Sequence, residues 1–165
     1  MPVKIKVENL TFTFPEGWEV SKFDDWNFYR GHFSKQMNDI KAVDLLAKGP
    51  DGTAYFIEVK DYRHPDTVKP SELADAIAWK VLMTLAALLP AKFHANSPDE
   101  KAVAAGVLGC TGFKVVAHLE PPLSHRFALD PADIKHKLKQ RLAAVDRHVK
   151  IVSMANMRGV AWSVH

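Results

Sequence analysis

The sequence is poor in cysteine and has no long apolar run free of charge. Its 165 residues include a single cysteine, Cys110, which excludes an internal disulfide and any zinc site built from several cysteines. The most apolar stretch, residues 73–90, contains Asp75 and Lys80 and is not expected to span a bilayer. Residues 1–14 alternate in polarity and lack the apolar centre of a signal peptide. These absences predict a cytoplasmic protein with no membrane segment.

Several common sites are also missing. The eight histidines are scattered without the spacing of a zinc protease, and no glycine-rich phosphate loop is present. Cys110 has no evident His and Asp partners for a cysteine nucleophile. The formal net charge of +3 is compatible with an anionic partner without identifying one.

The order of secondary-structure signals predicts an α/β fold. Expected strands occupy residues 3–14 (a bulged strand or a hairpin), 18–23, 40–47, 54–60 and 113–120, with two short strands about Asn156–Gly159. Expected helices occupy residues 71–89, 97–109 and 130–148, capped by Ser71, Ser97 and Asp130. We therefore expect one domain over residues 1–165, with a central mixed α+β-type sheet flanked by helices in three layers.

The segment 43–64, VDLLAKGPDGTAYFIEVKDYRH, carries charges within two apolar runs. The Gly-Pro-Asp-Gly turn predicts a hairpin whose pairing brings Asp44 opposite residues 56–58. Glu58 and Lys60 alternate along the second strand and therefore share a face. Two close carboxylates repel each other, and Mg²⁺ or Mn²⁺ would neutralise them through oxygen ligands. Lys60 would then assist the attack of a water molecule on a phosphate.

The combination of an Asp on one strand, a Glu-Val-Lys triplet on the next and a following helix resembles the PD-(D/E)XK nuclease superfamily, with its restriction-endonuclease-like fold. The resemblance covers residues 40–120 and implies that Asp44 and Glu58 bind the metal, with the Val59 carbonyl as a further ligand. It also implies a catalytic role for Lys60. Val43 stands where the family pattern has proline.

Members of this superfamily draw additional groups from neighbouring elements. An early acid would come from Asp24, Asp25, Asp39, Glu16 or Glu19, and Gln36 could fill an auxiliary role. Lys80 in the following helix either faces the site or extends to solvent along the surface. Arg63 either contacts phosphate or pairs with Asp61 or Asp66.

Two further features admit a binding role or an ordinary structural one. The helix 130–148 carries a basic face that could follow a nucleic-acid backbone or be plainly solvated, formed by Lys135, Lys137, Lys139, Arg141 and Arg147. An aromatic group could stack on bases or fill the core, formed by Trp18, Phe23, Trp26, Phe28, Tyr29 and Phe33.

The sequence thus predicts a Mg²⁺-dependent nuclease acting on nucleic acid, with DNA favoured by the family resemblance and a homodimer compatible with cutting two strands. The alternative is a catalytically degenerate protein of the same fold that binds nucleic acid or serves as an assembly subunit. A third interpretation is an unrelated α/β protein in which Glu58 and Lys60 form a surface ion pair.

Overall fold

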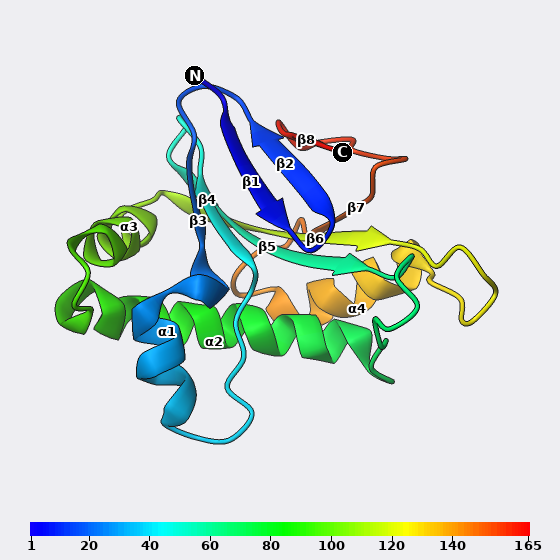
Figure 1. The fold of residues 1–165 in the computed structure, drawn as a ribbon, viewed down its shortest axis with the longest axis horizontal. Helices are drawn as coiled ribbons and strands as arrows, with labels where there is room; N and C mark the ends of the chain where they lie inside the picture. Colours follow the sequence, from blue (N-terminus) through cyan, green and yellow to red (C-terminus); the bar gives the residue numbers. More distant parts are fainter.

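The computed structural model describes residues 1–165 and shows two β-sheets and a layer of helices (Figure 1). The larger sheet has the order β3-β4-β5-β6-β7, and the smaller has the order β1-β2-β8. The strands are β1 (Val3–Val7), β2 (Leu10–Phe14), β3 (Glu19–Lys22), β4 (Leu45–Lys48), β5 (Thr53–Asp61), β6 (Gly112–Glu120), β7 (Lys150–Val152) and β8 (Ser163–Val164). The helices are α1 (Asn27–Gly31), α2 (Leu73–His94), α3 (Pro98–Leu108) and α4 (Pro131–Leu142), with short 3₁₀ turns η1 (Phe23–Asp25) and η2 (Phe33–Lys35). The predicted α/β class with a mixed sheet is confirmed.

The larger sheet is buried on both faces. Its β3-β4-β5 strands are antiparallel, whereas β5, β6 and β7 run parallel. Along β5, Phe56 belongs to the core beneath α2, while Ile57 and Val59 belong to a second core beneath the small sheet. This two-sided burial explains why β5 reads as an almost continuous apolar run in the sequence.

Helix α2 covers the sheet with an apolar stripe. Leu73, Ile77, Val81 and Leu88 are buried, and Leu85 is partly buried. The opposite side of α2 is exposed and presents Trp79, Leu82, Leu89 and Phe93. By length and composition α2 is the one helix that could cross a membrane, and 44% of its most apolar window is buried here.

The ends of α2 differ from the prediction. The helix begins at Leu73, so Ser71 is not its cap, and Glu72 in the cap position makes no side-chain hydrogen bond. It continues through Pro90 to His94 although proline removes a backbone donor and crowds the preceding turn, and Ala91 in the last turn is buried in the core. Tertiary burial therefore outweighs the local stop signal.

Helix α4 ends six residues before the predicted boundary of residue 148. The buried carboxylate of Asp146 accepts hydrogen bonds from Val115 N at 2.9 Å and His148 N at 2.7 Å, which turns the chain toward β7. The predicted caps Ser97 and Asp130 are confirmed. The two C-terminal strands do not pair around residues 156–159 as expected, because β7 joins β6 and β8 joins β2.

Asp146→Ala should lower the free energy of unfolding by about 2 kcal/mol, because it leaves the buried Val115 amide without an acceptor. Urea denaturation monitored by circular dichroism measures this loss. Asp66→Ala, at an exposed carboxylate, is the matched control and should change stability by less than about 0.5 kcal/mol. Equal effects of the two substitutions would contradict this role of Asp146.

Candidate active site

The β4–β5 pairing brings the two predicted carboxylates together. Leu45 lies opposite Ile57, so the next step of the register places Asp44 opposite Glu58, as the sequence predicted. Asp44 Oδ2 accepts a hydrogen bond from Val59 N at 2.7 Å. The N–H and C=O of a strand residue point to the same side of the strand. The Val59 carbonyl therefore also points toward Asp44, at the start of β4.

Glu58 is the most confined charged group of the site, with 1% of its side chain exposed. Its Oε1 atom lies 2.5 Å from Lys80 Nζ and 3.4 Å from Lys60 Nζ, whereas its buried Oε2 has no hydrogen-bond partner. Burial, followed by the charge of Asp44, raises the pKa of Glu58 to about 8 against the opposing effect of the two lysines. The carboxyl group is therefore poised to lose a proton when a cation approaches.

Lys80 faces the site from α2, where it interrupts the buried stripe. Burial opposes its charge, but Glu58 and Asp44 outweigh burial and raise the pKa of Lys80. Of the two possibilities left open by the sequence, the structure shows the inward orientation, with 17% of the side chain exposed.

Asp24 is the early acid that lies nearest to the hairpin. It belongs to η1, which is joined to the site by a hydrogen bond from Phe23 N to the Asp44 carbonyl at 3.0 Å. Burial and then the charge of Asp44 raise the pKa of Asp24, and its Oδ1 is buried without a partner. Sequence spacing could not select Asp24, since η1 has no periodic pattern that orients its side chains.

The other acids considered for this role are engaged elsewhere or exposed. Asp25 pairs with Lys22 and Arg30, and Asp39 is exposed. Glu16 binds the N-terminal amine, and Glu19 binds Lys48.

A cavity of about 340 Å³ opens over Glu58 between β5 and α2. Three of its lining residues are amines, contributed by Lys41, Lys60 and Lys80. The remaining wall comes from α2 and from the segment before it, including Val68 and Pro70. A pocket with one buried carboxyl and three ammonium groups is suited to a phosphate group.

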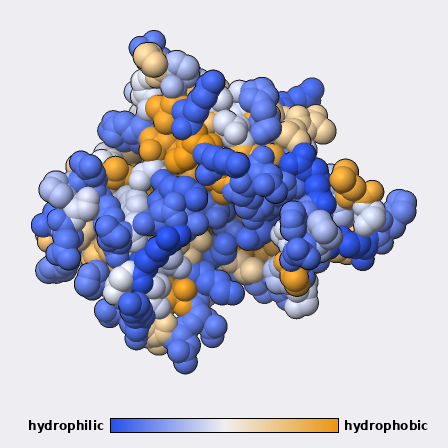
Figure 2. Space-filling view, viewed as in Figure 1, coloured by the Kyte–Doolittle hydropathy of each residue, from blue (hydrophilic) through white to orange (hydrophobic).

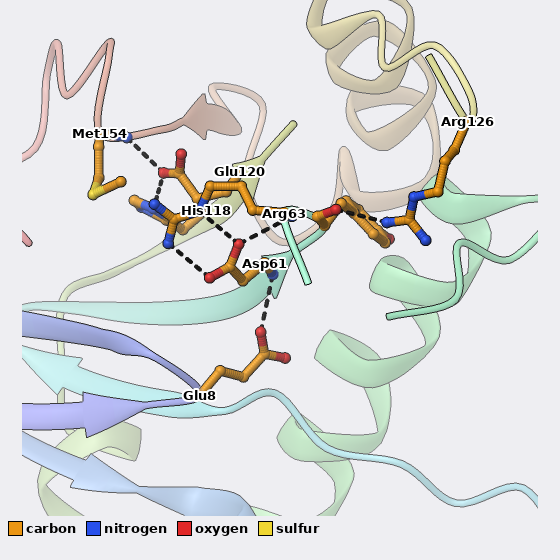
Figure 3. A network of polar contacts seen from close by, with 8 residues as sticks. Glu8, Asp61, Arg63, His118, Glu120, Arg126 and Met154 are labelled. Carbon is orange, nitrogen blue, oxygen red and sulfur yellow. Dashed lines mark hydrogen bonds and ion pairs between the residues drawn. The ribbon is translucent and has the colours of Figure 1, made fainter. Parts of the chain in front are cut away.

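Arg63 and Gln36 lie outside this cavity. Arg63 forms a two-pronged ion pair with Asp61, with Nε and Nη2 at 2.8 Å and 2.7 Å from the carboxylate oxygens (Figure 3). Asp61 alternates with Glu58 and Lys60 along β5 and therefore faces the small sheet. Gln36 lines a different cavity near the end of α2. The structure thus brings Asp44, Glu58, Lys60 and Lys80 together and leaves the other two apart.

The network around Asp61 joins the two sheets. Glu8 accepts a hydrogen bond from Asp61 N, and Glu120 accepts hydrogen bonds from His118 Nε2 and Met154 N, both at 2.7 Å (Figure 3). Burial lowers the pKa of His118, which keeps the ring neutral inside the core. Nearly every member has a partner, so this network is a structural one.

The oxygen atoms near the hairpin form a candidate donor set for a divalent cation. No three His, Cys, Asp or Glu side chains are arranged as a preformed metal centre. Glu58 Oε2 and Asp24 Oδ1 are, however, buried oxygens without partners. The oxygen-only donor set fits Mg²⁺, which commonly uses one or two carboxylates and retains several waters.

The aromatic group and the basic face of α4 are only partly available to contact nucleic acid. Most of the predicted aromatic group lies in the core, since Trp18, Phe23, Trp26 and Phe28 are buried. On α4, Lys137 and Arg141 pair with carboxylates. The face in Figure 2 is largely hydrophilic, with apolar residues gathered near the β1–β2 hairpin.

Comparisons with known proteins give one distant similarity. A cysteine–tRNA ligase of Neisseria meningitidis is 29% identical to this chain over an alignment 206 positions long. The alignment covers 97% of this chain and 29% of that protein. The chain therefore spans less than a third of the length of this relative. No protein-family profile and no solved structure matches the chain.

The raised pKa of Glu58 predicts a pH dependence of stability. Between pH 4.5 and about 8 the folded protein retains a proton that the unfolded chain releases, so this contribution to stability is complete below pH 4.5 and lost toward pH 8. The free energy of unfolding of the wild type should fall, relative to Glu58→Gln, by up to about 1.4 kcal/mol per pH unit over this range. Urea denaturation at pH 5, 6, 7 and 8 without divalent cations measures it, and parallel curves for the two proteins would contradict it.

Proposed function

We propose that the chain is a metal-dependent nuclease of the PD-(D/E)XK type, which hydrolyses phosphodiester bonds with Mg²⁺ or Mn²⁺. The observation that carries this proposal is the convergence of Asp44, Glu58, Lys60 and Lys80 at one end of a buried sheet, beside a cavity rich in amines. A surface ion pair would not require a carboxylate with 1% exposure. The compartment proposed for this activity is the cytoplasm.

Asp44 and Glu58 would hold the metal ion, with Asp24 and the Val59 carbonyl as supporting oxygens. When bound, the ion would supply a Lewis acid that polarises the phosphate and activates water. The Lys60 ammonium is 26% exposed and lies above Glu58, where it would orient the water and stabilise negative charge developing on the phosphate. Lys80 would hold Glu58 in place in the absence of the ion.

The substrate class is proposed as nucleic acid. The family resemblance favours DNA, whereas the name of the Neisseria relative refers to tRNA, so RNA belongs in the same test. Homodimerisation would supply a second site for the cleavage of both strands of a duplex.

A specific observation favours the alternative of a degenerate, nucleic-acid-binding member of this fold. Lys80 Nζ already occupies a position 2.5 Å from Glu58 Oε1, and no trio of metal ligands is preformed. In that case the amines around Glu58 would bind phosphate without catalysis. A measurement of divalent-cation binding distinguishes the nuclease from the degenerate binding protein.

Cleavage should require Mg²⁺ or Mn²⁺ and should fall about 100- to 1,000-fold in Lys60→Ala, because charge stabilisation of this kind typically contributes that factor. Labelled single- and double-stranded DNA and RNA, resolved on denaturing gels, provide the measurement. Lys101→Ala, which alters an exposed lysine on α3, is the control and should retain activity. Cleavage that persists equally in Lys60→Ala would reject the assigned role.

Mn²⁺ binding at pH 7 should release up to about one proton per ion, since Glu58 must ionise to become a ligand. Calorimetry in buffers of different ionisation enthalpy measures the released protons without reference to activity. Glu58→Gln should abolish both the release and most of the binding. An absence of binding at millimolar Mn²⁺ would favour the degenerate alternative.

A further inference from the structure

A second cavity, of about 330 Å³, lies between α1, η2 and the C-terminal end of α2. Its volume falls at the lower end of the range of roughly 300–1,000 Å³ that is usual for small-molecule sites. It is lined by Phe28, His32, Phe33, Gln36, Pro90, His94 and Asn96. The lining thus combines aromatic rings with amide and imidazole groups.

The polar groups of this cavity are available for a ligand. The side chains of His32, Gln36, His94 and Asn96 are exposed, and none of them makes a hydrogen bond within the protein. Amides present both donors and acceptors, and a neutral imidazole presents one of each. The lining contains no Lys, Arg, Asp or Glu, in contrast to the three amines around Glu58. The cavity is therefore suited to an uncharged, flat, hydrogen-bonding group rather than to a phosphate.

The aromatic lining provides surfaces for stacking. The rings of Phe28 and Phe33 lie 6.3 Å apart with an angle of 27° between their planes, and His32 lies 6.3 Å from Phe28 at 37°. Phe28 is buried and anchors the group, whereas Phe33 is only partly buried. Aromatic rings of this kind stack on nucleobases, and nearby amides bind the edges of unpaired bases.

The wall formed by α1 is held by a contact from another helix. The Glu100 carboxylate of α3 accepts hydrogen bonds from Asn27 N at 2.7 Å and Phe28 N at 3.2 Å. These amides at the start of α1 have no partner within that helix, so Glu100 both caps it and fixes its position. The cavity is consequently preformed on packed elements.

The cavity lies along the same helix as the candidate active site. Lys80 and Pro90 are ten residues apart on α2, which corresponds to about 15 Å along the axis. This distance equals roughly four nucleotides at the rise of about 3.4 Å per nucleotide of a stacked strand.

We infer that this cavity binds an unpaired nucleobase of a single strand whose phosphate, a few nucleotides away, lies over Glu58. The inference rests on the proposed function and narrows its substrate to single-stranded or locally unpaired nucleic acid. A base inside a duplex could not enter, because its hydrogen-bonding edge is already paired and its faces are stacked.

Binding of fluorescein-labelled 12-nucleotide single strands, measured by fluorescence anisotropy in EDTA, tests the inference without cleavage. An abasic site at the position that occupies the cavity should weaken binding about 5- to 100-fold, the range expected for loss of one stacked base. Replacement of other bases should have smaller effects. A fully paired duplex should bind more weakly than the single strand.

Phe33→Ala and Asn96→Ala should each weaken binding of the intact strand and remove the penalty of the abasic site. Met37→Ala, at an exposed residue next to the cavity, is the matched control and should behave as the wild type. Circular dichroism and thermal unfolding establish that the variants fold; Asn96 is exposed and unpartnered, so its substitution should leave the fold intact.

Several outcomes would overturn the inference. They are an equal penalty for every abasic position, an unchanged penalty in both cavity variants, or no binding of single strands at all. Because binding is measured without metal, base-dependent binding without cleavage would reject the nuclease and retain the cavity, whereas cleavage without base dependence would do the reverse.

Discussion

The contact between the Glu58 carboxyl group and the Lys80 ammonium is the interaction on which the arrangement of the site depends. It joins the central strand β5 to α2 inside the core, with 1% and 17% of the two side chains exposed. A buried carboxyl group without a hydrogen-bond partner would be destabilising, and Lys80 supplies that partner to Glu58 Oε1. The contact therefore ties α2 to β5 at the wall of the cavity over Glu58.

Alternation along β5 places the candidate site residues on one face of the sheet and the Asp61 network on the other. Glu58 and Lys60 point toward α2, where one carboxylate oxygen remains unpaired and the adjacent cavity is lined by amines. Asp61 points to the other face and joins a network in which Arg63 and the Glu8 carboxylate have defined partners. The hydrogen bonds of the Asp61 network hold the two sheets together on that face.

In the proposed function, the two cavities would recognise different parts of a nucleic-acid strand. The cavity over Glu58 offers amines, whereas the cavity at the end of α2 offers rings and amides. Both are lined in part by α2, and the second is also bordered by α1, whose start is held by Glu100. In the proposed complex, α2 would therefore set the distance between the phosphate and the base.

The sequence by itself determined the α/β class, the hairpin register and the shared face of Glu58 and Lys60, because strand period and turn residues are local properties. It also identified Asp130 and Ser97 as caps. Only the tertiary structure decided that Lys80 turns inward, that Asp24 is the nearest early acid, that Arg63 is held by Asp61, and that α2 runs past Pro90. Those outcomes depend on contacts between residues far apart in the chain, for which burial and charge pairing outweigh local preference.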